Sequence, residues 1–207
     1  LERLSLNVTR RGLVIGGGLS GMTAALALAD QGFEVYLVEK NKELGGFLRK
    51  IHYTLDNGDA QKYLKTMVER VNSNKLIQVF LNAKVEKISG YVGNFKTTIT
   101  LNSGSEAKKE LEHGVIIVAT GGEEYSPNEY LYGKDPHVLT QLELEKHIAV
   151  GGEEKFGNVV MIQCVGSRDE EHPWCSRVCC GKSVKNALKL KELNPEMNIY
   201  VLYRDMR

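Results

Sequence analysis

The sequence predicts an α/β protein in which two β-α-β units, residues 12–38 and 158–203, flank an antiparallel meander. Each unit places a helix between two short apolar runs, the pattern of two parallel strands joined by a crossover. Between the units, strand-like runs at 76–90, 95–101 and 107–112 are separated by Gly- and Asn-containing turns, as expected for the meander. The predicted class is therefore α/β with parallel sheets.

In the first unit, strand 12–15 stops at a glycine-rich turn, an Ala- and Leu-rich helix covers about 20–30, and strand 33–38 follows. A second helix is predicted over 59–72, because its apolar positions recur at the spacing of one buried helix face. The apolar run 114–118 predicts a further buried parallel strand.

Farther along, Thr140-Gln141-Leu142-Glu143 matches a capping box and predicts a helix to about Ile148. The Gly151-Gly152 stretch is the best candidate for a boundary, which gives a first domain of residues 1–152 and a partial second domain of residues 153–207. In the second unit we expect strand 158–164, loop 165–181, helix 182–193 and strand 198–203. Because a single β-α-β unit is a poor sheet and the chain begins with Leu, we expect a fragment of a longer protein.

Composition excludes some classes of partner. The 207 residues carry a formal net charge of +1, so no overall field attracts nucleic acid or an anionic membrane. The longest apolar run is far shorter than the roughly 20 residues of a membrane span. We therefore expect neither a nucleic-acid partner nor a membrane span.

The glycine-rich turn has the spacing of a dinucleotide-binding motif. Gly16 allows the tight turn, Gly18 lets a pyrophosphate approach the backbone, and Gly21 allows close packing of helix and strand. The helix N-terminus offers N–H groups to the pyrophosphate, and Glu39, at the end of the next strand, would accept hydrogen bonds from a ribose. The competing interpretation, a flavodoxin-like turn without nucleotide, is disfavoured because the motif follows a strand and precedes a helix.

Three features favour FAD over NAD: Gly45-Gly46 shortly after Glu39, the meander, and a strand that ends in Ala119-Thr120-Gly121. In this order they resemble the FAD domain of thioredoxin-reductase-like flavoproteins, a Rossmann-like fold that binds two dinucleotides. Arg49 either contacts the flavin or a phosphate, or is solvated. The residues expected to bind the cofactor are Gly16, Gly18, Leu19, Ser20, Gly21, Glu39, Lys40, Gly45, Gly46, Arg49, Ala119, Thr120 and Gly121.

All four cysteines, Cys164, Cys175, Cys179 and Cys180, fall within seventeen residues. This clustering favours a metal or redox site over disulfide staples. The spacing lacks the paired C-x2-C elements of zinc sites, and a neighbouring flavin needs a route for single electrons, so an iron–sulfur cluster is preferred to zinc. Free buried cysteines and a redox-active pair at Cys179-Cys180 are the alternatives. We expect Cys164 at a strand end and the other three in the loop before the last helix.

Five stretches resemble the HdrA-like subunit of heterodisulfide reductase, which is the subunit that contains the flavin. They are VIGGGLSGMTAALALADQGFEVYLVEKNKELGG at 14–46, IHYTLDNGDAQKYL at 51–64, GYVGNFKT at 90–97, VATGGEEYSPNEYLYG at 118–133 and QCVGSRDEEHPWCSRVCC at 163–180. The last is the most specific, since its four cysteines match that family's cluster ligands.

The resemblance implies an FAD-dependent electron-transfer subunit with a [4Fe-4S] cluster, in a cytoplasmic complex that splits electron pairs at the flavin between disulfide reduction and ferredoxin. Implied partners are the other heterodisulfide reductase-type subunits, an electron-donating hydrogenase or dehydrogenase, and ferredoxin. In methanogens the substrate of that complex is the mixed disulfide of coenzymes M and B. The family's ferredoxin-type cysteine repeats are absent from this sequence.

Two other classes of function remain open. One is a stand-alone FAD-dependent thiol or disulfide oxidoreductase that uses Cys179-Cys180, and the other is a non-catalytic scaffold that keeps the nucleotide turn. The second β-α-β unit lacks the glycine-rich turn that binds NAD(P)H in related reductases, which argues against hydride delivery from a nicotinamide. No nucleophile–base constellation is evident, so we predict no catalytic side chain; the chemistry would belong to the cofactors.

Overall fold

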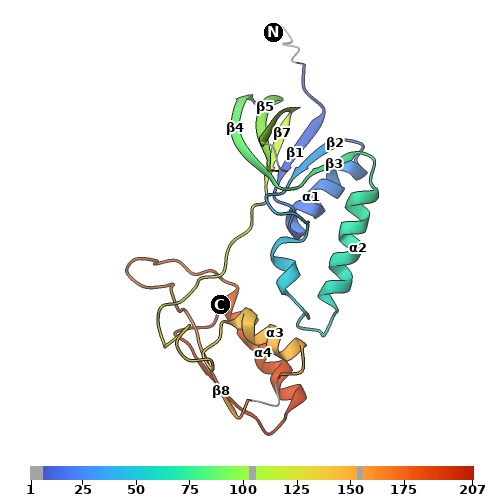
Figure 1. Cartoon of the computed structure of the whole chain (residues 1–207). Coiled ribbons are helices and arrows are strands. Elements are labelled where there is room, and N and C mark those ends of the chain that lie inside the picture. Colours follow the sequence, from blue (N-terminus) through green and yellow to red (C-terminus); the bar gives the residue numbers. More distant parts are fainter. Residues whose placement is uncertain (1–6, 103–105, 153–155) are drawn as a thin grey trace, which may run out of the picture. The chain divides into compact units, whose positions relative to one another are not determined.

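The computed structural model describes residues 7–102, 106–152 and 156–207 (Figure 1). By its contacts the chain divides into two compact units, one of Leu1–Arg49 with Ala60–Gly122 and one of Lys50–Asp59 with Glu123–Arg207. The chain therefore passes from one unit to the other three times. This division does not coincide with the predicted boundary at residue 152, because helix α3 (Gln141–Ala149) packs against helix α4 (Cys179–Leu193).

The first unit is built on a four-stranded parallel sheet in the order β3-β2-β1-β7. Helix α1 (Leu19–Asp30) connects β1 to β2, and this β-α-β unit confirms the predicted α/β class. Gly32, with φ +83°, lets the chain turn from α1 into β2. The strands are β1 (Arg11–Ile15), β2 (Glu34–Val38), β3 (Ile77–Phe80) and β7 (Val115–Val118).

Alternate side chains of the strands supply two separate cores. Val14 and Leu37 pack with α1 and with helix α2 (Ala60–Ser73) on one face of the sheet. Leu13 and Val38 pack on the other face against the antiparallel meander β4-β5-β6. Such alternation is what period-2 side-chain geometry requires of a sheet buried on both faces. The meander consists of β4 (Ala83–Tyr91), β5 (Asn94–Asn102) and β6 (Glu106–His113).

The prediction of a single strand over 76–90 is wrong. The run is broken at Asn82, which has φ +49°, a conformation that asparagine tolerates better than most residues. The part before the break, β3, pairs with β2 in the parallel sheet, and only the part after it, β4, belongs to the meander.

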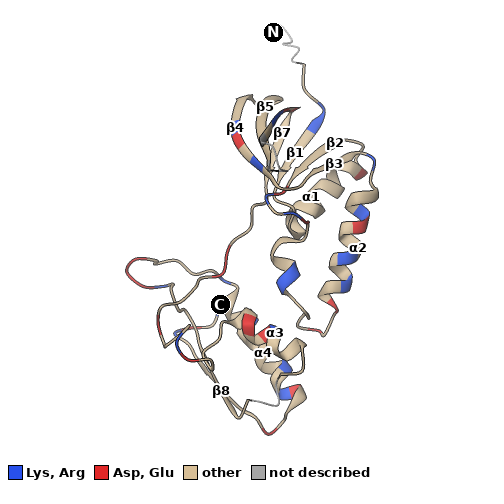
Figure 2. Cartoon of the chain, in the orientation of Figure 1, with Lys and Arg blue, Asp and Glu red and all other residues tan. Residues whose placement is uncertain are grey.

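Both signs of charge occur along α2 (Figure 2), in keeping with the near-zero net charge. The buried residues of α2, including Leu64, Met67 and Val71, share one face and leave the charges to solvent. Within the described ranges, the helices lack the combination of length and hydrophobicity that crossing a membrane requires.

The second unit contains α3, α4 and a two-stranded parallel sheet of β8 (Asn158–Ile162) and β9 (Asn198–Leu202). The predicted capping box starts α3: Thr140 Oγ1 accepts a hydrogen bond from Glu143 N, and Thr140 N donates one to the Glu143 carboxylate. The core of this unit joins both helices and both strands to Tyr53, which comes from the short excursion of the chain at Lys50–Asp59.

Two predicted positions in the cysteine segment need correction. Helix α4 begins at Cys179 rather than at 182, so Cys179 and Cys180 lie in its first turn and not in the loop before it. The earlier start is explained by burial, since Cys180 and Ser183 are both covered on the inner face of the helix. Strand β8 ends at Ile162, and Cys164 lies beyond it with φ +61°.

Candidate dinucleotide site and cysteine segment

The turn between β1 and α1 requires glycine at two positions for packing. Gly16 has φ +107°, and a Cβ atom there would lie 2.2 Å from the carbonyl oxygen of Ala119. A Cβ atom at Gly21 would lie 1.8 Å from the carbonyl oxygen of Gly16. Both positions therefore fit the predicted roles of tight turn and close helix packing.

Gly18 differs from these two glycines. Its φ of −72° and ψ of −175° are accessible to any residue, and a Cβ atom there would meet nothing within 4 Å. Packing and backbone conformation therefore do not explain the glycine. Gly18 is the N-cap of α1 and provides no side-chain cap, so the N–H groups of the first turn, which includes Leu19 and Ser20, lack a side-chain acceptor at the cap. The position is suited to close approach by a phosphate.

Glu39 follows the last residue of β2 and is only 4% exposed. Its Oε2 accepts a hydrogen bond from Gly17 N at 2.6 Å, and its Oε1 accepts one from Asn41 N at 2.8 Å. The carboxylate therefore holds the glycine-rich turn as well as being placed where a ribose reader is expected. The motif spacing predicts the second role but not the first.

Gly45 and Gly46 lie beside the same turn. Gly45 N donates a hydrogen bond to Gly17 O at 2.8 Å, and a Cβ atom at Gly46 would lie 3.0 Å from the Cα atom of Gly18. Both residues have positive φ, +118° and +50°. They lead into a short 3-10 helix, η1 (Gly46–Lys50), which the sequence analysis did not predict.

The remaining predicted cofactor residues differ in how closely they approach the turn. Ala119 N donates to Ile15 O at 2.8 Å, which places Ala119 and Thr120 against Gly16. Gly121 follows with φ +71°, and Lys40 is exposed. Arg49 is engaged within the chain: Nε donates to Leu44 O at 2.5 Å, and the guanidinium pairs with Glu43 at 3.0 Å. The structure thus brings together the glycine-rich turn, Gly45-Gly46, Glu39 and the end of β7. These residues fit a bound dinucleotide.

The four cysteines, unlike the predicted nucleotide-binding residues, are not arranged as a binding site in the described part of the structure. All four are free thiols; Cys180 is buried and the others are partly exposed. Cys175 Sγ accepts a hydrogen bond from Arg177 N at 3.3 Å. Among the residues that the structure describes, no group of three or more Cys, His, Asp or Glu side chains is arranged to hold a metal ion. The donor set is suitable for iron and sulfide, but its geometry here does not fit a cluster.

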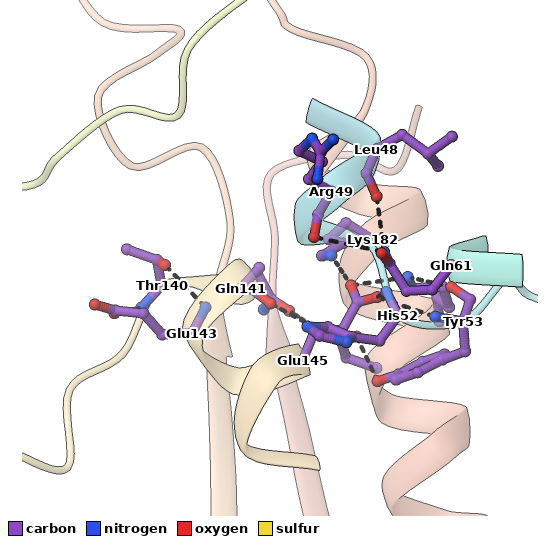
Figure 3. Close-up of polar contacts among 12 residues, drawn as sticks. Leu48, Arg49, His52, Tyr53, Gln61, Thr140, Gln141, Glu143, Glu145 and Lys182 are labelled. Carbon is purple, nitrogen blue, oxygen red and sulfur yellow. Dashed lines mark hydrogen bonds and ion pairs between the residues drawn. The ribbon is translucent and has the colours of Figure 1, made fainter. Parts of the chain in front are cut away.

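A buried polar network in the second unit was not predicted (Figure 3). Glu145 on α3 is fully buried and accepts hydrogen bonds from His52 N at 2.7 Å and, more weakly, from Tyr53 N at 3.4 Å. Two lysines of α4 form ion pairs with its carboxylate, Lys182 and, at 2.9 Å, Lys185. Sequence patterns carry no signal for this network, because the residues that contact Glu145 lie 37 to 93 positions away from it along the chain.

Burial shifts the titration of the network's side chains. Desolvation, reinforced by the neighbouring Lys185, lowers the pKa of Lys182 to about 7. Burial also lowers the pKa of Lys185 and raises that of Tyr53. Tyr53 OH donates a hydrogen bond to Asn186 Oδ1 at 2.9 Å, and Lys185 Nζ donates one to Tyr53 O at 2.8 Å. The network therefore binds the 50–59 excursion to both helices of the second unit.

Comparison with known proteins supports the flavoprotein fold. The sequence profile of the family described as pyridine nucleotide-disulphide oxidoreductase matches residues 10–156. Thioredoxin reductase from Lactococcus lactis superposes with a TM-score of 0.55 at 14% sequence identity, over 95% of this chain and 67% of that one. This likeness is one of fold and confirms the predicted thioredoxin-reductase-like architecture.

Curated relatives match the whole chain. A subunit of the H(2):CoB-CoM heterodisulfide,ferredoxin reductase of Methanothermobacter marburgensis is 29% identical over all of this chain and 45% of its own length. A CoB–CoM heterodisulfide reductase iron-sulfur subunit of Methanopyrus kandleri is 30% identical with the same coverages. The predicted resemblance to the HdrA-like component of heterodisulfide reductase is confirmed, and the chain spans less than half the length of these relatives.

Proposed function

Because the chain belongs to the pyridine nucleotide-disulphide oxidoreductase family, we propose that it binds FAD and serves as an electron-transfer subunit of a heterodisulfide reductase-type complex. The observation that carries the proposal is Gly18, a glycine that neither packing nor backbone conformation requires, at the N-terminus of α1. A ligand that must approach the backbone closely explains it.

The residues of the site divide the work of holding FAD. The first turn of α1 binds the pyrophosphate through its N–H groups and its dipole. The Glu39 carboxylate, which already accepts hydrogen bonds from Gly17 N and Asn41 N, accepts further hydrogen bonds from the ribose hydroxyls with its remaining lone pairs. Gly45 and Gly46, beside the turn, let the flavin approach the backbone. When bound, the flavin supplies electron transfer in one- or two-electron steps, and the protein sets its position and potential.

A [4Fe-4S] cluster on Cys164, Cys175, Cys179 and Cys180 is the second part of the proposal. It is supported by the soft donor set and by relatives that are named iron-sulfur subunits. Since the described thiols do not form a metal-binding group, cluster binding requires residues 165–178 to rearrange, as metal sites that form together with local folding do.

The proposed partners follow from the relatives' names, which include hydrogen, formate and ferredoxin. We place the protein in a cytoplasmic complex with other heterodisulfide reductase-type subunits and a hydrogenase or dehydrogenase as electron donor. In this proposal, electron pairs are split at the flavin between disulfide reduction and ferredoxin.

The test is anaerobic purification of the chain followed by its visible spectrum and assays of flavin, iron and sulfide. We expect bound flavin and about four iron and four sulfide per chain. Substituting any one of the four cysteines with Ser should then remove iron and retain flavin. Flavin without iron would favour the dithiol alternative at Cys179-Cys180, and the absence of both cofactors after reconstitution would favour a scaffold.

A further inference from the structure

We propose that Glu145 is a positioning residue for the flavin site, because it holds the chain segment that continues directly from the flavin-facing turn. The inference rests on the proposed function and adds a residue that lies outside the nucleotide motif. Glu145 belongs to the second unit, whereas the predicted flavin residues Gly45, Gly46 and Arg49 belong to the first.

Within the second unit, the anchor of the segment is strong. Glu145 is fully buried, and its carboxylate accepts the backbone N–H groups of His52 and Tyr53. Hydrogen bonds to a buried charged acceptor are among the stronger ones in proteins. Lys185 adds a hydrogen bond to the carbonyl oxygen of Tyr53, and its ammonium lies 4.5 Å from the centroid of the Tyr53 ring.

The segment is also tied within the first unit. Gly45 N bonds to Gly17 O of the nucleotide turn, and Arg49 Nε bonds to Leu44 O. From the start of α2, Gln61 Nε2 donates to Leu48 O at 3.0 Å. Figure 3 draws the contact between Gln61 and Leu48.

Only Lys50 and Ile51 separate the two sets of ties along the chain. A conformational constraint on His52 therefore reaches Arg49 and η1 through very few rotatable bonds. Without the Glu145 anchor, the segment gains conformational freedom that FAD binding would have to remove again. Loss of the anchor should therefore weaken flavin binding although no atom of Glu145 need touch the flavin.

The first test compares FAD affinity in E145Q and E143Q, both in the full chain. Glu143 lies on the same helix, and glutamine at its capping-box position still caps, so E143Q is the matched control. E145Q keeps an acceptor oxygen but leaves the two lysines without a counter-charge. We expect the dissociation constant of FAD to rise about tenfold in E145Q and to stay unchanged in E143Q. Equal affinities in the wild type and E145Q would overturn the proposal.

Hydrogen exchange of the wild type gives a readout that does not depend on a variant folding. FAD should slow exchange at the nucleotide turn and also at the amides of His52 and Tyr53. Protection confined to residues 16–21 would refute the role of Glu145 while leaving the flavin proposal intact. Failure of the wild type to bind FAD at all would overturn both.

Discussion

Gly18 and Gly21 lie three residues apart in one turn, yet packing requires glycine only at Gly21. A Cβ atom at Gly21 collides with the backbone of Gly16, whereas a Cβ atom at Gly18 meets nothing within 4 Å. Substitution can therefore separate a glycine needed for folding from one that we propose is needed for a ligand.

We predict that Gly18→Ala leaves stability nearly unchanged and weakens FAD binding at least about tenfold, because the methyl group occupies the space of the approaching pyrophosphate. Flavin retention after gel filtration and a fluorescence titration measure the affinity; thermal unfolding measures the stability. Gly157→Ala is the matched control, since a Cβ atom there also meets nothing within 4 Å. If G18A bound FAD as tightly as G157A, the assignment of this turn to the pyrophosphate would be wrong.

Glu39 combines a structural and a binding role at a single residue. Glu39→Gln replaces one acceptor oxygen by an NH₂ group that faces a backbone N–H donor, either Gly17 N or Asn41 N. We expect the free energy of unfolding to fall by about 1–3 kcal/mol, the cost of an unsatisfied buried donor. Urea unfolding of the flavin-free protein measures this loss. The exposed Glu69→Gln should leave the unfolding curve unchanged, and an equal effect of both substitutions would contradict the structural role.

At the scale of elements, the start of α3 depends on a local signal. Thr140→Ala removes the acceptor for Glu143 N and should destabilise the second unit by about 1 kcal/mol. Thr140→Ser keeps the hydroxyl and should retain most of that stability. Chemical denaturation followed by circular dichroism makes the comparison, and indistinguishable curves for the two variants would show that the cap contributes nothing.

Elements with local signals were predicted well. The predicted helices at 20–30 and 59–72 differ from α1 and α2 by no more than one residue at either end, and the capping box places α3 correctly. The glycine and glutamate positions of the candidate site were also predictable, because the motif spans a single β-α-β unit whose geometry is nearly invariant.

Features that depend on distant partners were not predictable. The break at Asn82 matters because β3 pairs with β2, which lies about forty residues earlier. The start of α4 depends on burial of Cys180, which periodicity in a short polar segment cannot indicate. The capture of residues 50–59 depends on Glu145, for which the sequence offers no local pattern.

At the scale of the whole molecule, one histidine contributes to the pH dependence of stability. His113, at the end of β6, is fully buried. Its Nδ1 faces Val115 O, which can only accept, so Nδ1 carries the proton and Nε2 accepts from Thr97 Oγ1 at 2.8 Å. Burial lowers the pKa of His113 from 6.5, so the folded protein protonates this imidazole less readily than the unfolded chain does.

The unfolded chain therefore binds more protons at His113 than the folded chain, and the free energy of unfolding should fall as the pH drops below 6.5. The slope from this one group is at most about 1.4 kcal/mol per pH unit. Urea midpoints between about pH 6.5 and 5.5, above the range where carboxylates titrate and below the pKa of about 7 of Lys182, measure it. In His113→Gln the midpoints should vary less over this range, and an unchanged slope would exclude His113 as its source.

The three passages of the chain between its units have a consequence for synthesis on the ribosome. Residues 50–59 emerge early, and the first unit can complete its sheet once β7 has emerged, before α3 and α4 exist. Until α3 and α4 have emerged, residues 50–59 form a loop whose two ends belong to the folded first unit. Glu145 and Asn186 must therefore bind a segment that has already been closed into a loop, and the second unit completes its core only after both of its helices have been synthesised.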